Sequence, residues 1–267
     1  MKSLKIIVVS LLVTSLLSCK KEIVVSTPEA ANTHLKLTFT NISNAPVANP
    51  SSAADWNSFF ATATNATTAF TSVKIVGNEV ELIGGKGLTI KQNAFYRSAS
   101  LVKIEDDSTV IGVATYAFAN AFELNSVSLN YATSIGANGF QGNAKTVTVS
   151  IKKAVNIGNA AFDHNLKLKT VFAENVETIG ESAFGSCNEF AVGIFPKCTN
   201  VGDAAFAYCP LTNLDLRTCL YLGNTISEDF VFYAIAGKTI SIKIPAATAT
   251  DADIAALQID NNVTITQ

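Results

Sequence analysis

Phenylalanine recurs at a nearly constant spacing through the middle of the chain. The first interval is 23 residues and the next four are 22 residues each. The residue before each phenylalanine is small, and a branched apolar residue lies five positions before it. Glycine follows this branched residue in the last four copies, which gives the unit Ile-Gly-x-x-Ala-Phe, as in residues 179–184. The six phenylalanines are Phe95, Phe118, Phe140, Phe162, Phe184 and Phe206.

A short run of alternating apolar and polar residues follows each phenylalanine, most clearly in Leu124-x-x-Val127-x-Leu129. Such alternation predicts a β-strand. One strand and its return segment cannot bury their apolar edge alone, so copies must stack into a continuous core. We expect the repeat glycines to permit a tight chain reversal, and the small residues to let coils approach. The pattern predicts an α/β or mainly β solenoid of about six to seven 22-residue coils over residues 85–245.

The extended unit Ile-Gly-x-x-Ala-Phe-x-x-Asn/Cys-x-x-Leu-x-x-Val-x-Leu resembles the BspA-like leucine-rich repeat of bacterial surface proteins. The resemblance implies a solenoid with a surface-binding, often adhesive, role. We expect no enzymatic activity, because the few titratable residues form no convergent set. It names no ligand, because one fold hosts many functions. Lys91 and Ala114 stand where glycine is expected, and Gly193 stands where a branched residue is expected. We therefore expect irregularity in the first, second and fifth coils.

Both ends of a solenoid need a cover for their open apolar edges. Residues 51–84 read as an N-terminal cap, with a helix that carries Trp56, Phe59 and Phe60 and a hairpin that turns at Gly77-Asn78. Residues 246–267 read as a C-terminal cap, with a helix at 251–257 and a final strand at 263–266. Residues 20–50 read as a tether, within which 35–39 are a candidate short strand.

The first 19 residues have the features of a lipoprotein signal peptide. Two lysines precede an apolar run at 6–17 that is short for a bilayer span. The run ends at Cys19, which resembles the lipidated cysteine of a bacterial lipobox; an ordinary secretory signal is the alternative. Contact with the membrane would then be through the lipid alone. Glu22 favours the cell surface of a Bacteroides-type outer membrane over an anchor that faces the periplasm.

Few residues suggest chemistry. A net charge of −2 without a basic stripe argues against nucleic acid, and no catalytic, cofactor or metal motif is present. His164 and Cys187, one coil apart, are the sole candidate catalytic pair, and a solvated histidine is the favoured interpretation. We expect Asp106-Asp107 to be a solvated loop rather than a calcium site. Four cysteines form two stacked pairs, Cys187 with Cys209 and Cys198 with Cys219, for which core thiols are favoured over disulfides or a metal site.

The outward strand positions carry mostly small and polar residues, except for one apolar cluster on two neighbouring strands. Phe172, Val192 and Ile194 should lie side by side, next to Thr170, as a candidate binding surface. The alternative is a bulge at Gly193 that turns Val192 and Ile194 inward. The sequence predicts a cell-surface adhesion module that binds a protein partner. The alternatives are a carbohydrate-binding accessory lipoprotein and a structural envelope protein.

Overall fold

The structure is a computed structural model that describes residues 33–61, 69–223, 240–245 and 263–266. The chain divides into a unit of residues 1–31 and a second unit of residues 32–267. The predicted signal peptide with Cys19, and the predicted helix at 251–257, lie outside the described residues. Among those residues, no helix has the length and apolar character needed to cross a membrane.

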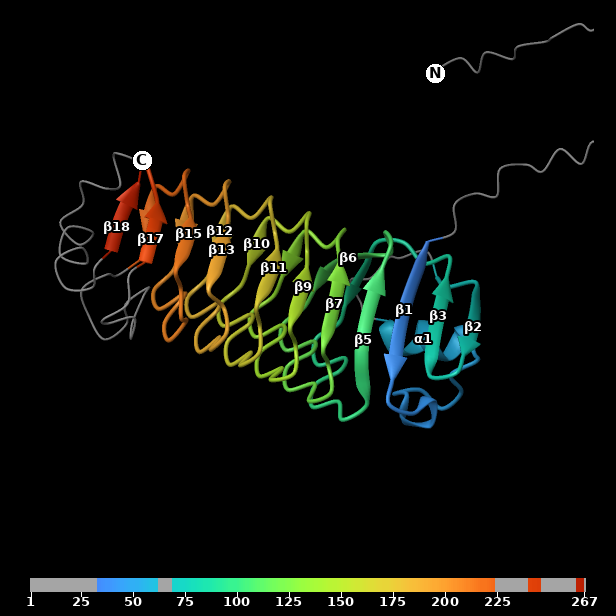
Figure 1. Ribbon diagram of the computed structural model, residues 1–267. Coiled ribbons are helices and arrows are strands. Elements are labelled where there is room, and N and C mark those ends of the chain that lie inside the picture. The colour runs from blue at the N-terminus through green and yellow to red at the C-terminus, as the bar shows by residue number, and fades with distance from the viewer. Residues whose placement is uncertain (1–32, 62–68, 224–239, 246–262, 267) are drawn as a thin grey trace, which may run out of the picture. The chain divides into compact units, whose positions relative to one another are not determined.

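The predicted solenoid is confirmed. Each coil contributes one strand to a front ladder and a shorter strand to a rear ladder, and both ladders are parallel (Figure 1). The front strands are β5 (Leu101–Asp106), β7 (Ser126–Leu129), β9 (Thr148–Ser150), β11 (Thr170–Phe172), β13 (Val192–Ile194), β15 (Asn213–Asp215) and β17 (Ile240–Lys243).

The rear strands form one seven-stranded sheet without interruption. In the six repeat copies they end at the branched apolar residue of the unit, which is buried. They are β4 (Leu88–Ile90), β6 (Val110–Val113), β8 (Ser134–Ile135), β10 (Asn156–Ile157), β12 (Thr178–Ile179), β14 (Asn200–Val201) and β16 (Tyr221–Leu222).

The six repeat phenylalanines form a continuous stack through the core. Consecutive rings lie 4.9–5.5 Å apart between centroids, and their planes agree within 9°. Every one of these rings is buried. Identical side chains at a fixed sequence interval therefore fill identical layers, which explains why the spacing of phenylalanine sets the coil length.

The repeat glycines have a different role from the predicted one. None of Gly136, Gly158, Gly180 and Gly202 has a positive φ, so they do not make a left-handed reversal. A Cβ on each would instead lie 2.5–2.8 Å from backbone atoms of the preceding coil, which is closer than real Cβ contacts. Lys91 occupies this position in the first coil, because no repeat precedes it. The second coil carries Ala114 there, and in the four coils that carry glycine it is the close approach of the preceding coil that leaves no space for a side chain.

The left-handed backbone lies two residues before and two residues after each repeat phenylalanine. Most of these positions are not glycine: Ala160 and His164, for example, have φ of 51° and 57°. Left-handed conformations cost an L-residue roughly 1–2 kcal/mol. The stacking of the coils therefore holds the backbone in a conformation that most of these residues disfavour.

The N-terminal cap contains the expected helix and hairpin. Helix α1 (Ala53–Phe60) begins after Ser52, whose hydroxyl accepts the Asp55 N–H at 3.1 Å. The hairpin is β2 (Ser72–Val76) and β3 (Glu79–Ile83). Phe59 of α1 lies 5.5 Å from Phe95, the first ring of the phenylalanine stack. The helix therefore covers the apolar end of the solenoid.

The predicted tether is too long, because its second half belongs to the fold. Strand β1 (His34–Phe39) lies between β3 and β5 and is antiparallel to both (Figure 1). Its inward residues Leu35, Leu37 and Phe39 are buried, and the 3-10 helix η1 (Ile42–Asn44) follows. The three alternating apolar residues form a buried strand, although the polar composition of the segment suggested a tether. At the other end, the predicted final strand is β18 (Val263–Thr266), which pairs with β17.

Candidate interaction surface at a break in the front sheet

The outward face of the front strands is polar in most coils and apolar in the fourth and fifth. Ser126, Ser128, Thr148 and Ser150 occupy outward positions of β7 and β9 and are half-buried. At the matching positions of β11 and β13, Phe172, Val192 and Ile194 are 45%, 45% and 54% exposed. The alternative of a bulge that turns Val192 and Ile194 inward is therefore wrong. Gly193, between them, is the buried residue.

The front ladder is interrupted at this same place. Its strands form one sheet in the order β11-β9-β7-β5-β1-β3-β2 and a second in the order β13-β15-β17-β18. In intact coils the residue after the strand donates to the next coil: Ile151 N–H to Phe172 O at 2.9 Å, and Phe195 N–H to Asp215 O at 2.9 Å. The equivalent bond from Ala173 N–H to Ile194 O is absent from the described structure. Nothing in the sequence pattern of β11 itself predicts this break.

A change in the size of the inward side chains accompanies the break. The fourth coil has Leu168, Val171 and Ala173 at its three inward positions, and the fifth has Phe190, Gly193 and Phe195. The rings of Phe190 and Phe195 both lie against Phe184, at 5.2 and 5.7 Å between centroids. Two rings now occupy a layer that smaller side chains fill elsewhere.

Gly193 is part of the same adjustment. A Cβ on Gly193 would lie 3.0 Å from the Phe195 ring and 2.6 Å from Leu214. A branched residue at this position would therefore require the side chains of Leu214 and Phe195 to move. The unexpected residue in the fifth coil signalled an irregularity, but only the structure shows that it separates two sheets.

A groove of about 350 Å³ lies over the break. Val171 is partly exposed there, whereas the equivalent Val127 and Val149 are 1% and 0% exposed. The rim carries Lys169, which forms an ion pair with Glu189 at 3.1 Å. All four predicted binding residues line the groove, whose walls are Lys169, Thr170, Val171, Phe172, Ala173, Glu174, Val192 and Ile194.

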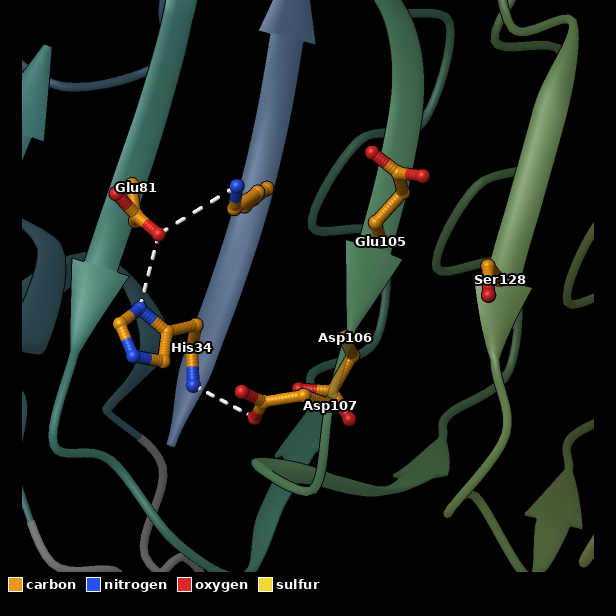
Figure 2. Close-up of a pocket in the computed structure, with 7 residues that line it drawn as sticks. His34, Glu81, Glu105, Asp106, Asp107 and Ser128 are labelled. Carbon is orange, nitrogen blue, oxygen red and sulfur yellow. Dashed lines mark hydrogen bonds and ion pairs between the residues drawn. The ribbon is translucent and has the colours of Figure 1, made fainter. Parts of the chain in front are cut away.

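A second hollow of about 430 Å³ lies where β1 enters the sheet, and it is polar (Figure 2). His34 Nδ1 lies 2.9 Å from Glu81 Oε1, and Lys36 Nζ lies 3.5 Å from the same oxygen. Burial raises the pKa of Glu81, but Lys36 and His34 outweigh it and hold that pKa below its ordinary value. The His34 backbone N–H donates to Asp107 at 2.7 Å. These contacts join the cap to the first coil.

Asp106 is not the solvated loop residue that the sequence suggested. It is buried, and its carboxylate accepts the N–H groups of Thr109 at 2.9 Å and Val110 at 3.1 Å. Burial raises its pKa to about 6, although both hydrogen bonds act in the opposite direction. Among the described residues, no cluster of histidine, cysteine and acidic side chains has the arrangement of a metal site. Asp106 closes a turn.

The four cysteines of the repeat region are buried thiols. Cys187 and Cys209 donate to Phe162 O and Phe184 O at 3.2 and 3.0 Å. In earlier coils this position is asparagine, and Asn143 and Asn165 instead accept backbone N–H groups at 2.8 and 2.7 Å. The position therefore binds turn backbone, as its residue types predicted.

Three of these thiols, those of Cys187, Cys198 and Cys219, are poor nucleophiles. Burial raises the pKa of Cys187 well above its ordinary range, and it raises those of Cys198 and Cys219 to about 12 and about 11. His164 does not activate Cys187: its exposed ring lies 2.8 Å from the Asp163 carboxylate. The candidate catalytic pair is therefore not formed.

Comparison with known families identifies the repeat. Residues 88–213 match the model of the BspA type leucine rich repeat region in six copies. Neither the curated proteins nor the solved structures contain a match to the chain. Repeats of this kind build extended surfaces that bind other proteins. With its 22-residue coils and stacked phenylalanines, the array over residues 88–213 belongs to the BspA-type leucine-rich repeat family.

Proposed function

We propose that this chain is a non-catalytic binding module that recognises a protein partner through the groove between β11 and β13. The observation that carries the proposal is the exposure of Phe172, Val192 and Ile194 around that groove. Exposed apolar clusters of this kind are typical of protein interaction sites. The front strands β7 and β9 offer small polar residues on the same face, so among the described front strands this apolar cluster lies on β11 and β13.

The groove suits a protein better than a glycan. Sugar-binding surfaces commonly offer flat aromatic rings, and Phe172 is the single aromatic residue among the groove walls. The walls combine one ring with branched aliphatic side chains and with a lysine and a glutamate at the rim. Interface cores that bind proteins have this mixture of apolar centre and polar edge.

A binding screen tests this proposal. The protein is presented to panels of surface proteins and of glycans, and the double variant Phe172→Ser, Ile194→Ser is compared with wild type. We expect protein partners and a loss of at least about tenfold in affinity, because one buried apolar side chain is worth about 1.5–3 kcal/mol. The matched control is Phe122→Ser, Ile111→Ser, which removes side chains of 50% and 45% exposure far from the groove.

Two results of the screen would contradict the proposal. Partners that bind both variants equally would place the interaction elsewhere on the solenoid. Hits confined to glycans would instead support the carbohydrate-binding alternative, and failure of both panels would support a structural role in the envelope. Unfolding curves of both variants are compared first, since exposed substitutions change stability by about 0.5 kcal/mol or less.

We also propose that a lipid on Cys19 holds the module at the outer membrane with the repeats outside the cell. The apolar run at 6–17, the cysteine that follows it and Glu22 support this location. Protease treatment of intact cells is the test, with Cys19→Ala as the control for anchoring. Digestion without lysis is the expected result. Protection until lysis would place the repeats in the periplasm and would remove adhesion from the proposal.

A further inference from the structure

We infer that the turn edge of the first two coils binds an oligosaccharide that carries a carboxylate, at a site made by Tyr96, Arg97 and Tyr116. The turn edge consists of the turns at 91–100 and 114–125, which lead from the rear strands to the front strands (Figure 1). This site is separate from the groove between β11 and β13. The rings would pack against the sugar, and the guanidinium would bind its carboxylate.

Two exposed tyrosine rings form a corner on this edge. Tyr96 follows the repeat phenylalanine of the first coil, and Tyr116 comes two residues before that of the second coil. The ring centroids are 6.4 Å apart and the ring planes meet at 76°. The two residues are 42% and 38% exposed. The face of an aromatic ring carries partial negative charge, so a pyranose can enter this corner with its C–H groups against one of the rings.

Tyr116 lies where the backbone disfavours a bulky residue. Its φ is 55°, in the left-handed region, which asparagine tolerates and in which a bulky residue is an outlier. The other repeat coils carry small residues at this position, namely Asn93, Asn138, Ala160, Ser182 and Ala204. The fold therefore does not require an aromatic ring at position 116. Backbone outliers of this kind cluster at sites that bind ligands.

Arg97 supplies a positive charge beside the two rings. Its Cζ lies 5.3 Å from the centroid of the Tyr96 ring, and stacking of this kind orients a guanidinium without using its N–H donors. Among the described residues Arg97 forms no ion pair. A guanidinium has a planar fork of donors that matches the two oxygens of a carboxylate. The charge therefore favours an acidic sugar over a neutral one.

Amide side chains surround these three residues. Asn93 and Asn138 occupy the position of Tyr116 in the coils on either side, and Asn120 occupies the position of Arg97 in the next coil. Asn93 is exposed and the other two are half-buried. An amide offers donors and an acceptor together, which suits the hydroxyl groups of a sugar. The centre of a protein interface is more apolar than this edge, so the edge fits a glycan better.

The site can be removed with residues that other coils already carry. Tyr116→Asn copies Asn138 of the third coil, and Arg97→Asn copies Asn120 of the second coil. Both of these asparagines have a φ of 55° in the native fold, and asparagine tolerates that backbone better than tyrosine or arginine does. We therefore expect both variants to fold.

The matched control is Tyr131→Asn, which copies Asn175 of the fourth coil. Tyr131 is 40% exposed, and Lys153 Nζ lies over its ring at 3.8 Å. This tyrosine and its cation lie in the opposite turn, between a front strand and a rear strand. The control thus removes a similar ring from a place outside the site.

Calorimetric titration of the folded chain with trigalacturonic acid and with its methyl ester is the test. The two probes share their sugar rings and differ in charge. We expect the acid to bind at least about tenfold more tightly than the ester, because the ester cannot form the charge-assisted bond with Arg97. Arg97→Asn should abolish this preference. Tyr116→Asn should weaken both probes by roughly three- to tenfold, since it removes one packed ring.

A sialylated trisaccharide, titrated in parallel, distinguishes a uronic acid from a sialic acid as the source of the carboxylate. Tyr131→Asn and the groove variant Phe172→Ser, Ile194→Ser should bind each acidic probe as wild type does.

Three results would overturn the inference. They are the absence of saturable binding of every acidic probe, equal affinity of the wild-type chain for acid and ester, and unchanged affinity in Tyr116→Asn. The comparison of acid with ester needs no variant, so it decides the question by itself. A protein partner lost in Tyr116→Asn, with no acidic sugar bound, would identify the edge as a protein surface instead. None of these results affects the proposed function, whose ligand and variant are different.

Discussion

Substitution of Gly158 by alanine tests the physical basis of the repeat. A Cβ at this position would lie 2.7 Å from Ala137 N, 2.8 Å from Gly136 C and 3.0 Å from Ile135 O. All three atoms belong to the backbone of the preceding coil, so no side chain can turn away to make room. An ordinary contact needs about 3.4 Å, so the two coils must separate by roughly 0.7 Å at this point.

The expected cost follows from this displacement. Over-packing of a tightly packed site costs about 1–3 kcal/mol. Alanine also lowers the conformational entropy of the unfolded chain, which offsets about 0.4–1 kcal/mol of that cost. We therefore expect Gly158→Ala to lower the free energy of unfolding by about 1–2 kcal/mol, measured by urea denaturation with circular dichroism.

Lys91→Ala provides the matched control, because Lys91 occupies the same repeat position in the coil that no other repeat precedes. Its ammonium lies over the Phe59 ring at 4.8 Å, a partly buried contact worth about 1 kcal/mol. The control should therefore lose no more than about 1 kcal/mol. An unchanged stability of Gly158→Ala would refute the argument that close approach of the coils, rather than backbone conformation, requires the glycine.

Three further predictions concern the core and its titrating groups. The pKa of Asp106 is raised from 3.8 to about 6 in the folded protein, so between these pH values the folded state binds more protons than the unfolded state. The free energy of unfolding should therefore fall as pH rises from about 4 to 6. Unfolding curves of Asp106→Asn should lack this part of the decline. Phe140→Ala should cost about 3–5 kcal/mol, since the ring is buried between two others, whereas Phe122→Ala at an exposed position should change the midpoint of urea unfolding little. Cys187 and Cys209 should react with a thiol reagent only after urea is added, because both side chains are buried and a reagent cannot reach them in the folded protein; rapid labelling of the native protein would contradict their placement in the core.

The regular part of the fold was predictable because one residue pattern recurs in it. Six phenylalanines at a fixed interval determine the coil length, and the alternation after each of them determines which strand residues point inward. The outward exposure of Phe172, Val192 and Ile194 followed from this phase alone. Each of these predictions depends on local periodicity, which a single sequence displays directly.

The features that the sequence did not predict depend on contacts between distant segments. The sequence offered residues 35–39 as a candidate strand within a tether, but it did not predict that β1 joins the main sheet, because its partners β3 and β5 lie about forty or more residues further along the chain. The role of Gly158 became visible only from the backbone of the neighbouring coil. The break between β11 and β13 coincides with the packing of Phe190 and Phe195 against Phe184, and composition does not reveal that packing.

Site-specific photo-crosslinking tests the central claim, that the groove face contacts a protein. A photoreactive amino acid is placed at Thr170, in the groove wall, and separately at Thr148, which pairs with Thr170 in the adjacent coil. Protein adducts at position 170 and none at 148 are the predicted result, with loss of the adduct in Phe172→Ser, Ile194→Ser. Adducts of equal yield at both positions, or adducts that persist in the double variant, would contradict the account.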